Sequence, residues 1–247
     1  MLLHGTNSSR QVWAPLLPAL TATRDVVAVD LPGHGASPAG AGGWTPPEFA
    51  VAVAALLDEL GWERPAVAGH SVGGWTALEL GVRRRAGAVL ALVPAGLWRA
   101  RSPLLTDVGL TVDWTLGRLA GPLAEPVLRR PRGRALALSK ISAEPRAIPA
   151  QVAVAAARQG GATAGFPQHF RATRRLRFRG GAAIPATVPV RVVWAAQDRI
   201  ALAGRSRHPD ELPAHATVET WDRCGHMTMW DQPQRTAAAA AALTVPA

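Results

Sequence analysis

The sequence contains a serine, an aspartate and a histidine in a pattern suited to nucleophilic catalysis. Ser71 lies in a Gly-x-Ser-x-Gly segment, and Asp198 and His226 follow it in that order, each after a predicted strand. A serine hydroxyl is a weak nucleophile at neutral pH and needs an imidazole to accept its proton. The imidazole in turn needs a carboxylate that fixes its tautomer and stabilises its charged form. We therefore predict that Ser71 is the nucleophile, His226 the base and Asp198 the orienting acid.

The residues around Ser71 predict a tight turn between a buried strand and a helix. Short apolar residues precede it, and Val72 begins a run with helical spacing of its apolar side chains. Gly69 and Gly73 lack the bulk that such a turn excludes. Free N–H groups at a helix start stabilise developing negative charge. We predict the backbone N–H of Val72 as one oxyanion donor and that of Thr6 as the second. An ordinary glycine-rich turn with an exposed serine is the alternative.

Short apolar runs alternate with helical patterns along much of the chain. This alternation predicts a doubly wound α/β fold, with a mostly parallel sheet and helices on both faces. In such sheets ligands bind beyond the carboxyl ends of the strands, which is where all three candidate catalytic residues fall. The segment ending at Trp44 is expected to be a glycine-rich loop tip. The expected strands lie at 2–3, 25–30, 65–69, 87–93, 188–194 and 216–221, and the expected helices at 11–20, 46–60, 72–82 and 232–243.

The pattern changes between residues 97 and 180. This segment has no convincing strand, and it has four amphipathic helical patches that proline and glycine interrupt. We expect a core formed by residues 1–96 and 181–247, with 97–180 inserted as a helical cap, or lid, over one end of the sheet. The four patches cover residues 104–119, 127–138, 150–157 and 166–176.

The inserted segment also carries the chain's positive charge. The formal net charge is +10, from 27 basic and 17 acidic residues, and residues 97–180 hold 15 of the basic and 4 of the acidic ones. A solvated basic surface is the simplest interpretation, and attraction of anionic substrates or surfaces is the alternative. Because the charge is confined to one segment, we do not expect specific nucleic-acid binding.

Composition excludes several other classes of protein. A single cysteine, Cys224, rules out a disulfide framework, and a buried inert thiol is the expected state. There is no apolar run of about 18 residues, so no membrane span is expected. The first residues lack the basic and apolar regions of a signal peptide, which favours a cytoplasmic protein. The sequence leaves the oligomeric state open.

Five segments together resemble the α/β-hydrolase-fold superfamily, in its serine-nucleophile branch with a helical cap. The resemblance implies a small-molecule substrate, a catalytic triad with a nucleophile elbow, and no cofactor or metal. Asp30 and His34 would then support a loop rather than bind metal. Only three residues precede His4 here, so either the strands that the family has before this point are missing or the true start of the protein lies upstream. The matching segments are 4–6, 30–37, 69–74, 197–198 and 225–226 with 231–233.

Further residues are candidates for the substrate pocket. His4 and His70 flank the predicted oxyanion site, although a packing and hydrogen-bonding role is the main alternative for His4. Trp98 and Trp114 fall in the expected cap and could line a pocket from above. Met227 lies next to the predicted base.

The leading functional hypothesis is a carboxylesterase-like hydrolase of a small ester, lactone or related acyl substrate. One alternative keeps the same triad for hydrolysis of a carbon–carbon bond in a dienoic diketone acid. Another is a non-catalytic ligand-binding protein with this fold. Within the resemblance, Ser71 argues against the branches that use an aspartate nucleophile, the epoxide hydrolases and haloalkane dehalogenases. The sequence does not identify the substrate.

Overall fold

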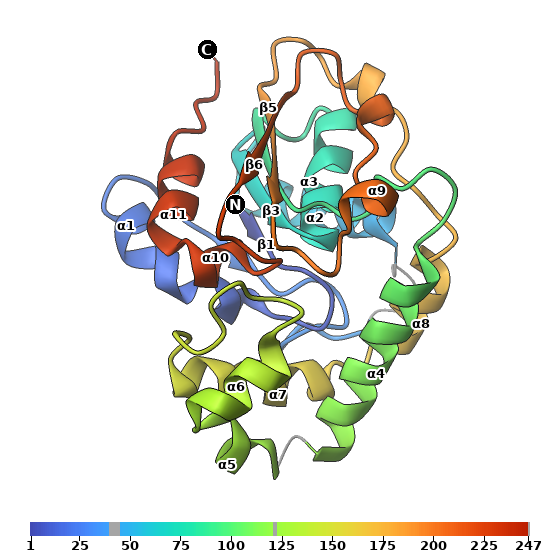
Figure 1. The fold of residues 1–247 in the computed structure, drawn as a ribbon. Coiled ribbons are helices and arrows are strands. Elements are labelled where there is room, and N and C mark those ends of the chain that lie inside the picture. The colour runs from blue at the N-terminus through green and yellow to red at the C-terminus, as the bar shows by residue number, and fades with distance from the viewer. Residues whose placement is uncertain (40–44, 121–122, 247) are drawn as a thin grey trace.

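A computed structural model describes residues 1–39, 45–120 and 123–246. Its strands form one parallel sheet in the order β2-β1-β3-β4-β5-β6, which confirms the predicted fold class (Figure 1). The predicted glycine-rich tip before Trp44 includes residues 40–44, which lie outside the described residues. The strands are β1 Leu2–Leu3, β2 Ala28–Val29, β3 Ala66–His70, β4 Ala88–Leu92, β5 Val190–Ala195 and β6 Thr217–Trp221.

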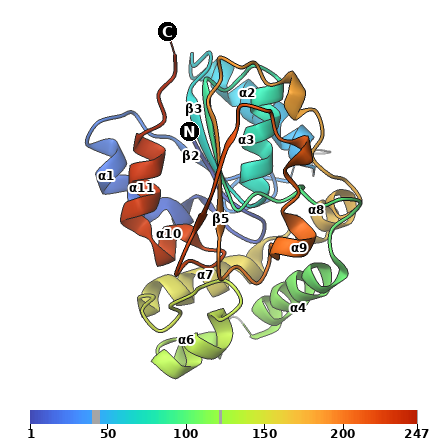
Figure 2. The same ribbon diagram turned by 45° about the horizontal axis from the view of Figure 1, so that its top comes forward.

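Helices cover both faces of the sheet. Helices α2 and α3 pack together on one face, while α1 and α11 pack on the other (Figures 1 and 2). Strand β4 lies between β3 and β5, and all five of its residues are buried, as expected for an apolar strand covered on both sides. The core helices are α1 Leu17–Thr21, α2 Pro46–Glu59, α3 Val72–Val82, α9 Ala203–Ser206, α10 Thr228–Asp231 and α11 Pro233–Ala241.

The helix predicted at 11–20 is divided in two. Residues Arg10–Leu16 form a 3₁₀ helix, and α1 begins only at Leu17. Pro15 and Pro18 cannot donate the backbone hydrogen bonds that a continuous α-helix would require there. Pro18 instead lies in the first turn of α1, where no donor is needed.

Residues 97–180, called the cap segment below, are helical. They contain no strand among the residues that the structure describes, and their helices lie together beyond the carboxyl end of the sheet (Figure 2). The predicted patch at 127–138 forms two helices, because Pro131 starts a new one. The boundaries 97 and 180 of a separate cap unit stay a prediction. The helices are α4 Leu104–Ala120, α5 Ala124–Leu128, α6 Pro131–Leu138, α7 Ala150–Ala162 and α8 Phe166–Thr173.

None of the helices in the described ranges has both the length and the apolar character needed to cross a membrane.

Two glycine substitutions test how tightly the sheet packs against α3. A Cβ atom at Gly69 would lie 2.0 Å from the carbonyl oxygen of Gly73, whereas one at Gly109 in α4 would meet nothing within 4 Å. We expect Gly69→Ala to lower the free energy of unfolding by about 3 kcal/mol or more. Gly109→Ala, the control, should raise it by up to about 1 kcal/mol, because alanine is the better helix former. Urea denaturation measures both, and equal stability of the two variants would contradict the packing described.

Candidate active site

Ser71 occupies a strained turn between β3 and α3. Its φ of 54° and ψ of −115° are unusual for a residue with a side chain. Two neighbouring segments hold this conformation. The N–H of Ser71 donates to the carbonyl of Leu92 at 2.9 Å, and its own carbonyl accepts from the N–H of Ala95 at 3.0 Å. The backbone therefore presents Ser71 at the carboxyl end of the sheet.

The loop after β1 lies directly against this turn. A Cβ atom at Gly73 would come within 2.3 Å of the carbonyl oxygen of Leu3, and one at Gly5 within 3.0 Å of the Cβ of Ser71. Both glycines are therefore sites of close backbone approach. This packing brings Thr6 and Val72, the predicted oxyanion donors, to the wall of the same cavity as Ser71. Their role as donors stays a prediction.

Asp198 and His226 form a buried pair. The Nδ1 of His226 lies 2.8 Å from Oδ2 of Asp198. The second carboxylate oxygen, Oδ1, accepts from the N–H groups of Ile200 at 2.7 Å and Ala201 at 2.9 Å. Burial acts to raise the pKa of Asp198, but the nearby His226 and these hydrogen bonds outweigh it, and the net pKa is lowered.

The pair fixes the tautomer of His226. An ionised carboxylate can only accept hydrogen bonds, so Nδ1 of His226 carries the proton and Nε2 keeps its lone pair. His226 and Ser71 line the same cavity, whereas Asp198 does not line it. Nε2 is thus left able to accept a proton, and the transfer of that proton from Ser71 stays a prediction.

His70 supports the loop that carries His226. Its Nε2 donates to the backbone carbonyl of His226 at 2.9 Å, and the two rings meet edge to face with centroids 4.8 Å apart. Burial, followed by the proximity of His226, lowers the pKa of His70 to about 3. The ring is therefore neutral at physiological pH, and it also lines the cavity.

His4 lies behind the loop that carries Thr6. Its Nδ1 donates to the carbonyl of Gly5 at 2.7 Å, and its Nε2 accepts from the N–H of Leu31 at 3.0 Å. Burial lowers the pKa of His4 to about 3. It is fully buried and is not among the residues lining the cavity, so its contacts are those of the packing and hydrogen-bonding alternative.

Asp30 and His34 lie in the loop after β2. The Asp30 carboxylate accepts from the side chain and backbone N–H of Arg10 and from the N–H of Ala36, and Nδ1 of His34 donates to the carbonyl of Pro32 at 3.1 Å. Within residues 1–39, 45–120 and 123–246 no group of three or more His, Cys, Asp or Glu side chains is arranged to hold a metal ion.

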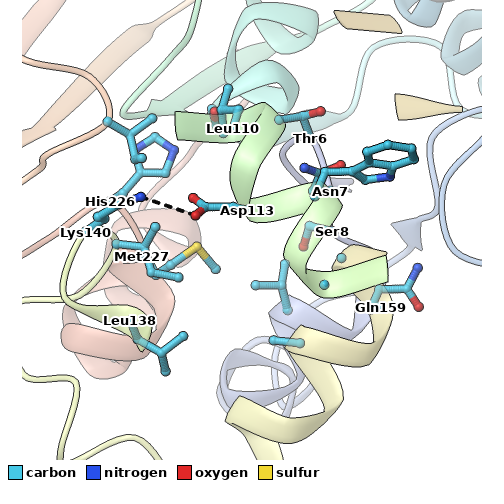
Figure 3. A pocket seen from close by; sticks show the side chains of 18 of the residues that line it. Thr6, Asn7, Ser8, Leu110, Asp113, Leu138, Lys140, Gln159, His226 and Met227 are labelled. Carbon is cyan, nitrogen blue, oxygen red and sulfur yellow. Dashed lines mark hydrogen bonds and ion pairs between the residues drawn. The ribbon is translucent and has the colours of Figure 1, made fainter. Parts of the chain in front are cut away.

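A cavity of about 1180 Å³ separates the cap segment from the sheet. Thr6 lies on one side of it and His226 with Met227 on the other (Figure 3). The candidate residues Trp98 and Trp114 both line it, anchored by indole N–H bonds to the carbonyls of Leu176 at 2.8 Å and Thr163 at 3.1 Å. Most of the remaining lining is apolar, so the cavity suits a substrate with a sizeable hydrocarbon part.

The cavity also contains an ion pair that sequence reasoning missed. Nζ of Lys140 lies 3.3 Å from Oδ1 of Asp113, and both side chains line the cavity near His226 (Figure 3). Lys140 is the single lysine of the chain, which is only a weak indication of a special role. The ion pair itself could not be predicted, because nothing in the sequence relates position 140 to position 113.

Asp231 links the cap segment to the loop of His226. Its carboxylate accepts from the hydroxyl of Ser142 at 2.5 Å and from the N–H groups of Ala143 at 2.9 Å and Gly225 at 2.6 Å. The backbone N–H of Met227 donates to the carbonyl of Ile141 at 2.8 Å, alongside this network. Asp231 lies in one of the segments that match the family, so the sequence pointed to this residue. It did not indicate that Ser142, Ala143 and Gly225 would be its partners.

A parallel α/β sheet with a serine on a strained turn, and an Asp–His pair in the loops after β5 and β6, indicates the class of protein. Residues 1–239 match the Alpha/beta hydrolase family. The chain belongs to that family, which confirms the resemblance inferred from the five segments.

A curated relative supports the same assignment. Over 185 residues the chain is 35% identical to the epoxide hydrolase EphH of Mycobacterium tuberculosis, an alignment that covers 72% of this chain and 85% of that protein.

Solved structures share the fold at lower sequence identity. A bacterial membrane phospholipase A superposes with a TM-score of 0.74 at 23% identity, over 98% of this chain and 76% of that one. The meta-cleavage product hydrolase CumD of Pseudomonas fluorescens IP01 also superposes with a TM-score of 0.74, at 18% identity, over 97% of this chain and 88% of that one. At these identities the likeness establishes the fold alone.

The neutral histidines predict a stability that falls in acid. His4 and His70 have a pKa of about 3 in the folded protein, against about 6.5 for a histidine in an unfolded chain. Between these values the unfolded chain binds more protons, so the free energy of unfolding should fall as the pH falls from 6.5 towards 3. Each histidine contributes up to about 1.4 kcal/mol per pH unit.

Urea denaturation across this pH range measures the slope. His70→Gln keeps a donor for the carbonyl of His226 but cannot titrate, so its slope should be shallower by up to about 1.4 kcal/mol per pH unit. A slope equal to that of the unsubstituted protein would contradict a neutral buried His70.

Removing the Asp231 carboxylate should destabilise the protein. Asp231→Ala leaves one hydroxyl and two N–H donors without their acceptor, and hydrogen bonds to a charged group contribute about 1.5–3 kcal/mol each. We expect a loss of about 3 kcal/mol or more in the free energy of unfolding. Asp210→Ala, at an exposed aspartate, is the control and should change it by less than about 0.5 kcal/mol. Similar losses in both variants would argue against the linking role.

Proposed function

We propose that this protein is a serine hydrolase that cleaves a small ester, lactone or related acyl substrate without a cofactor. The observation that carries the proposal is the position of Ser71. It lies on a strained turn at the wall of an apolar cavity, and that wall also holds His226 with its Nδ1 bonded to buried Asp198.

The geometry supports an acyl-enzyme mechanism. Nε2 of His226 takes the hydroxyl proton as Oγ of Ser71 attacks the carbonyl carbon, and the oxyanion accepts hydrogen bonds from the backbone amides of Val72 and Thr6. When the tetrahedral intermediate collapses, His226 gives the proton to the leaving alcohol. His226 then takes a proton from water, whose oxygen attacks the acyl carbon, and returns it to Ser71 as the acid leaves. Asp198 stabilises the imidazolium in each step.

The name of the relative EphH raises epoxide hydrolysis as another reaction. A carboxylate that opens an epoxide forms an ester, which water can then cleave. A serine alkoxide that opened an epoxide would form an ether, which has no acyl carbon for water to attack. Ser71 therefore favours acyl substrates.

Carbon–carbon hydrolysis of a dienoic diketone acid is the second candidate, using the same triad. The observation that favours it is the presence of Lys140 and Arg174 in the cavity lining, because cationic side chains suit a carboxylated substrate. The fold likeness to CumD is compatible with this candidate but does not distinguish it from an esterase.

Intact-mass analysis after treatment with a fluorophosphonate tests the proposal. We expect one adduct on the folded protein and none on Ser71→Ala, because only an activated serine reacts at an appreciable rate. From a panel of esters, lactones, diketones and epoxides, the unsubstituted protein should then hydrolyse an acyl substrate and leave the epoxides intact, with kcat/KM lowered at least a thousandfold in Ser71→Ala. No adduct on a folded protein would favour a non-catalytic binding role, and epoxide turnover that survives Ser71→Ala would refute the assignment of the nucleophile.

A further inference from the structure

Helix α4 carries an apolar stripe that faces solvent. Leu104, Val108, Val112 and Leu119 are 62%, 52%, 43% and 74% exposed, and their spacing places them along one side of the helix. We call these four residues the outer stripe. The opposite side of α4, which includes Trp114, lines the cavity. Helix α4 therefore has one side that faces the cavity inside the protein and an apolar side that is exposed to solvent.

Such a stripe is unusual on the surface of a protein. Single exposed apolar residues are common, but a contiguous apolar surface marks a site of contact with another molecule or a lipid phase. The outer stripe runs along a helix of 17 residues, which is about 25 Å long. In Figure 1 this helix lies at the edge of the molecule, away from the sheet.

Arginines surround the end of the stripe that begins α4. Arg101 precedes the helix, and the N–H of Ser102 donates to the carbonyl of Arg174 at 3.0 Å, which brings Arg174 and Arg175 to the same end. Arg118 lies in the last turn of the helix. In the described part of the chain no carboxylate lies within ion-pair distance of Arg101, Arg174 or Arg175.

The charge of the whole cap segment has the same sign. Thirteen of its fifteen basic side chains are exposed, against two of its four acidic ones. A second copy of this chain docked through the same surface would bring an equally basic surface against the stripe, and the two would repel. An anionic surface would gain from both the apolar contact and the positive charge.

We propose that the outer stripe and its flanking arginines dock the cap segment on an anionic lipid bilayer. The apolar side chains enter the boundary between headgroups and acyl chains, while the arginines contact lipid phosphates and carboxylates. This is the mode in which amphipathic helices lie in a membrane interface, and it requires no membrane-spanning helix.

The docked face also adjoins the cavity. Leu116 lies on α4 beside the stripe, Leu123 directly precedes α5, and Val127 lies within α5. They are 57%, 74% and 48% exposed, and all three line the cavity. Apolar surface is therefore continuous from the outside of the cap segment to the cavity that holds Ser71. This part of the inference rests on the proposed function and assigns it a substrate class, an ester whose acyl chain resides in a bilayer.

Cosedimentation of the full chain with vesicles tests the docking. We expect binding to vesicles of phosphatidylcholine with 30% phosphatidylglycerol, and at least tenfold weaker binding to phosphatidylcholine alone or at high salt. The double variant Val108→Glu with Val112→Glu should bind the anionic vesicles at least tenfold more weakly. Val51→Glu is the matched control, because Val51 is 58% exposed on α2, outside the cap segment, and it should bind like the unsubstituted protein.

A charge variant provides a second measurement. Arg101→Gln with Arg175→Gln leaves the stripe intact and should also weaken binding to the anionic vesicles, with less residual salt dependence. Unchanged binding by both double variants, or no binding of the unsubstituted protein, would overturn the proposal. A dimer in solution that the stripe variant alone converts to monomer, without an effect on vesicle binding, would show that a second copy covers the stripe.

The same measurements on Ser71→Ala separate this inference from the proposed function. Docking does not involve Ser71, so this variant should bind vesicles like the unsubstituted protein. Loss of the fluorophosphonate adduct with intact vesicle binding would leave docking standing without hydrolysis. An intact adduct without vesicle binding would leave a hydrolase whose substrate does not come from a bilayer.

Discussion

The close contact of backbone with backbone around Ser71 is the constraint on which the rest of the site depends. Strand β1 pairs with β3 so that Leu3 lies opposite Gly69, and the carbonyl of Leu3 leaves no room for a Cβ atom at Gly73. The strained conformation of Ser71 costs about 1–3 kcal/mol and persists only because its surroundings determine it. The hydrogen bonds to Leu92 and Ala95 come from the neighbouring strand β4 and the loop after it. Sheet register therefore sets the position of Ser71.

The neutral state of two buried histidines shapes the electrostatics of the site. His4 and His70 are neutral because burial opposes their protonation, so neither ring competes with His226 for the carboxylate of Asp198. The backbone N–H groups of Ile200 and Ala201 occupy the other oxygen of Asp198. A carboxylate held in this way cannot rotate away from His226 without losing two hydrogen bonds, which fixes the ring for proton transfer.

The sequence predicted the features that local patterns determine. Alternating apolar runs and helical periodicities were sufficient for the parallel sheet, because its central strands are short and largely apolar, as in Ala88–Leu92. Ser71, Asp198 and His226 could be placed after strands because those strands were themselves predictable from the sequence. The break of the helix at 11–20 was also within reach, since Pro15 and Pro18 are visible in the sequence.

Contacts between distant segments were not predictable. Asp113 meets Lys140, and Asp231 meets Ser142, only after the cap segment has folded over the sheet, and neither pair has a periodic or spacing signal. The outer stripe could be recognised as an amphipathic pattern in the sequence, but the side of α4 that faces the cavity could not. When a helix is apolar on two sides, the periodicity of its sequence does not show which of the two sides the fold covers.

The cap segment is linked to the loops of Asp198 and His226 through more than one set of hydrogen bonds. The hydroxyl of Thr106, on α4, donates to the carbonyl of Ile200 at 3.0 Å, and the N–H of the same Ile200 donates to Asp198. One residue thus separates the helix that carries the outer stripe from the carboxylate that orients His226. On the other side, Asp231 joins the loop at Ser142 to the His226 loop. Because interiors are closely packed, a shift of α4 against the sheet cannot leave the Asp198 loop unaffected. The proposed docking of α4 is therefore connected to the Asp198–His226 pair through Thr106 and Ile200.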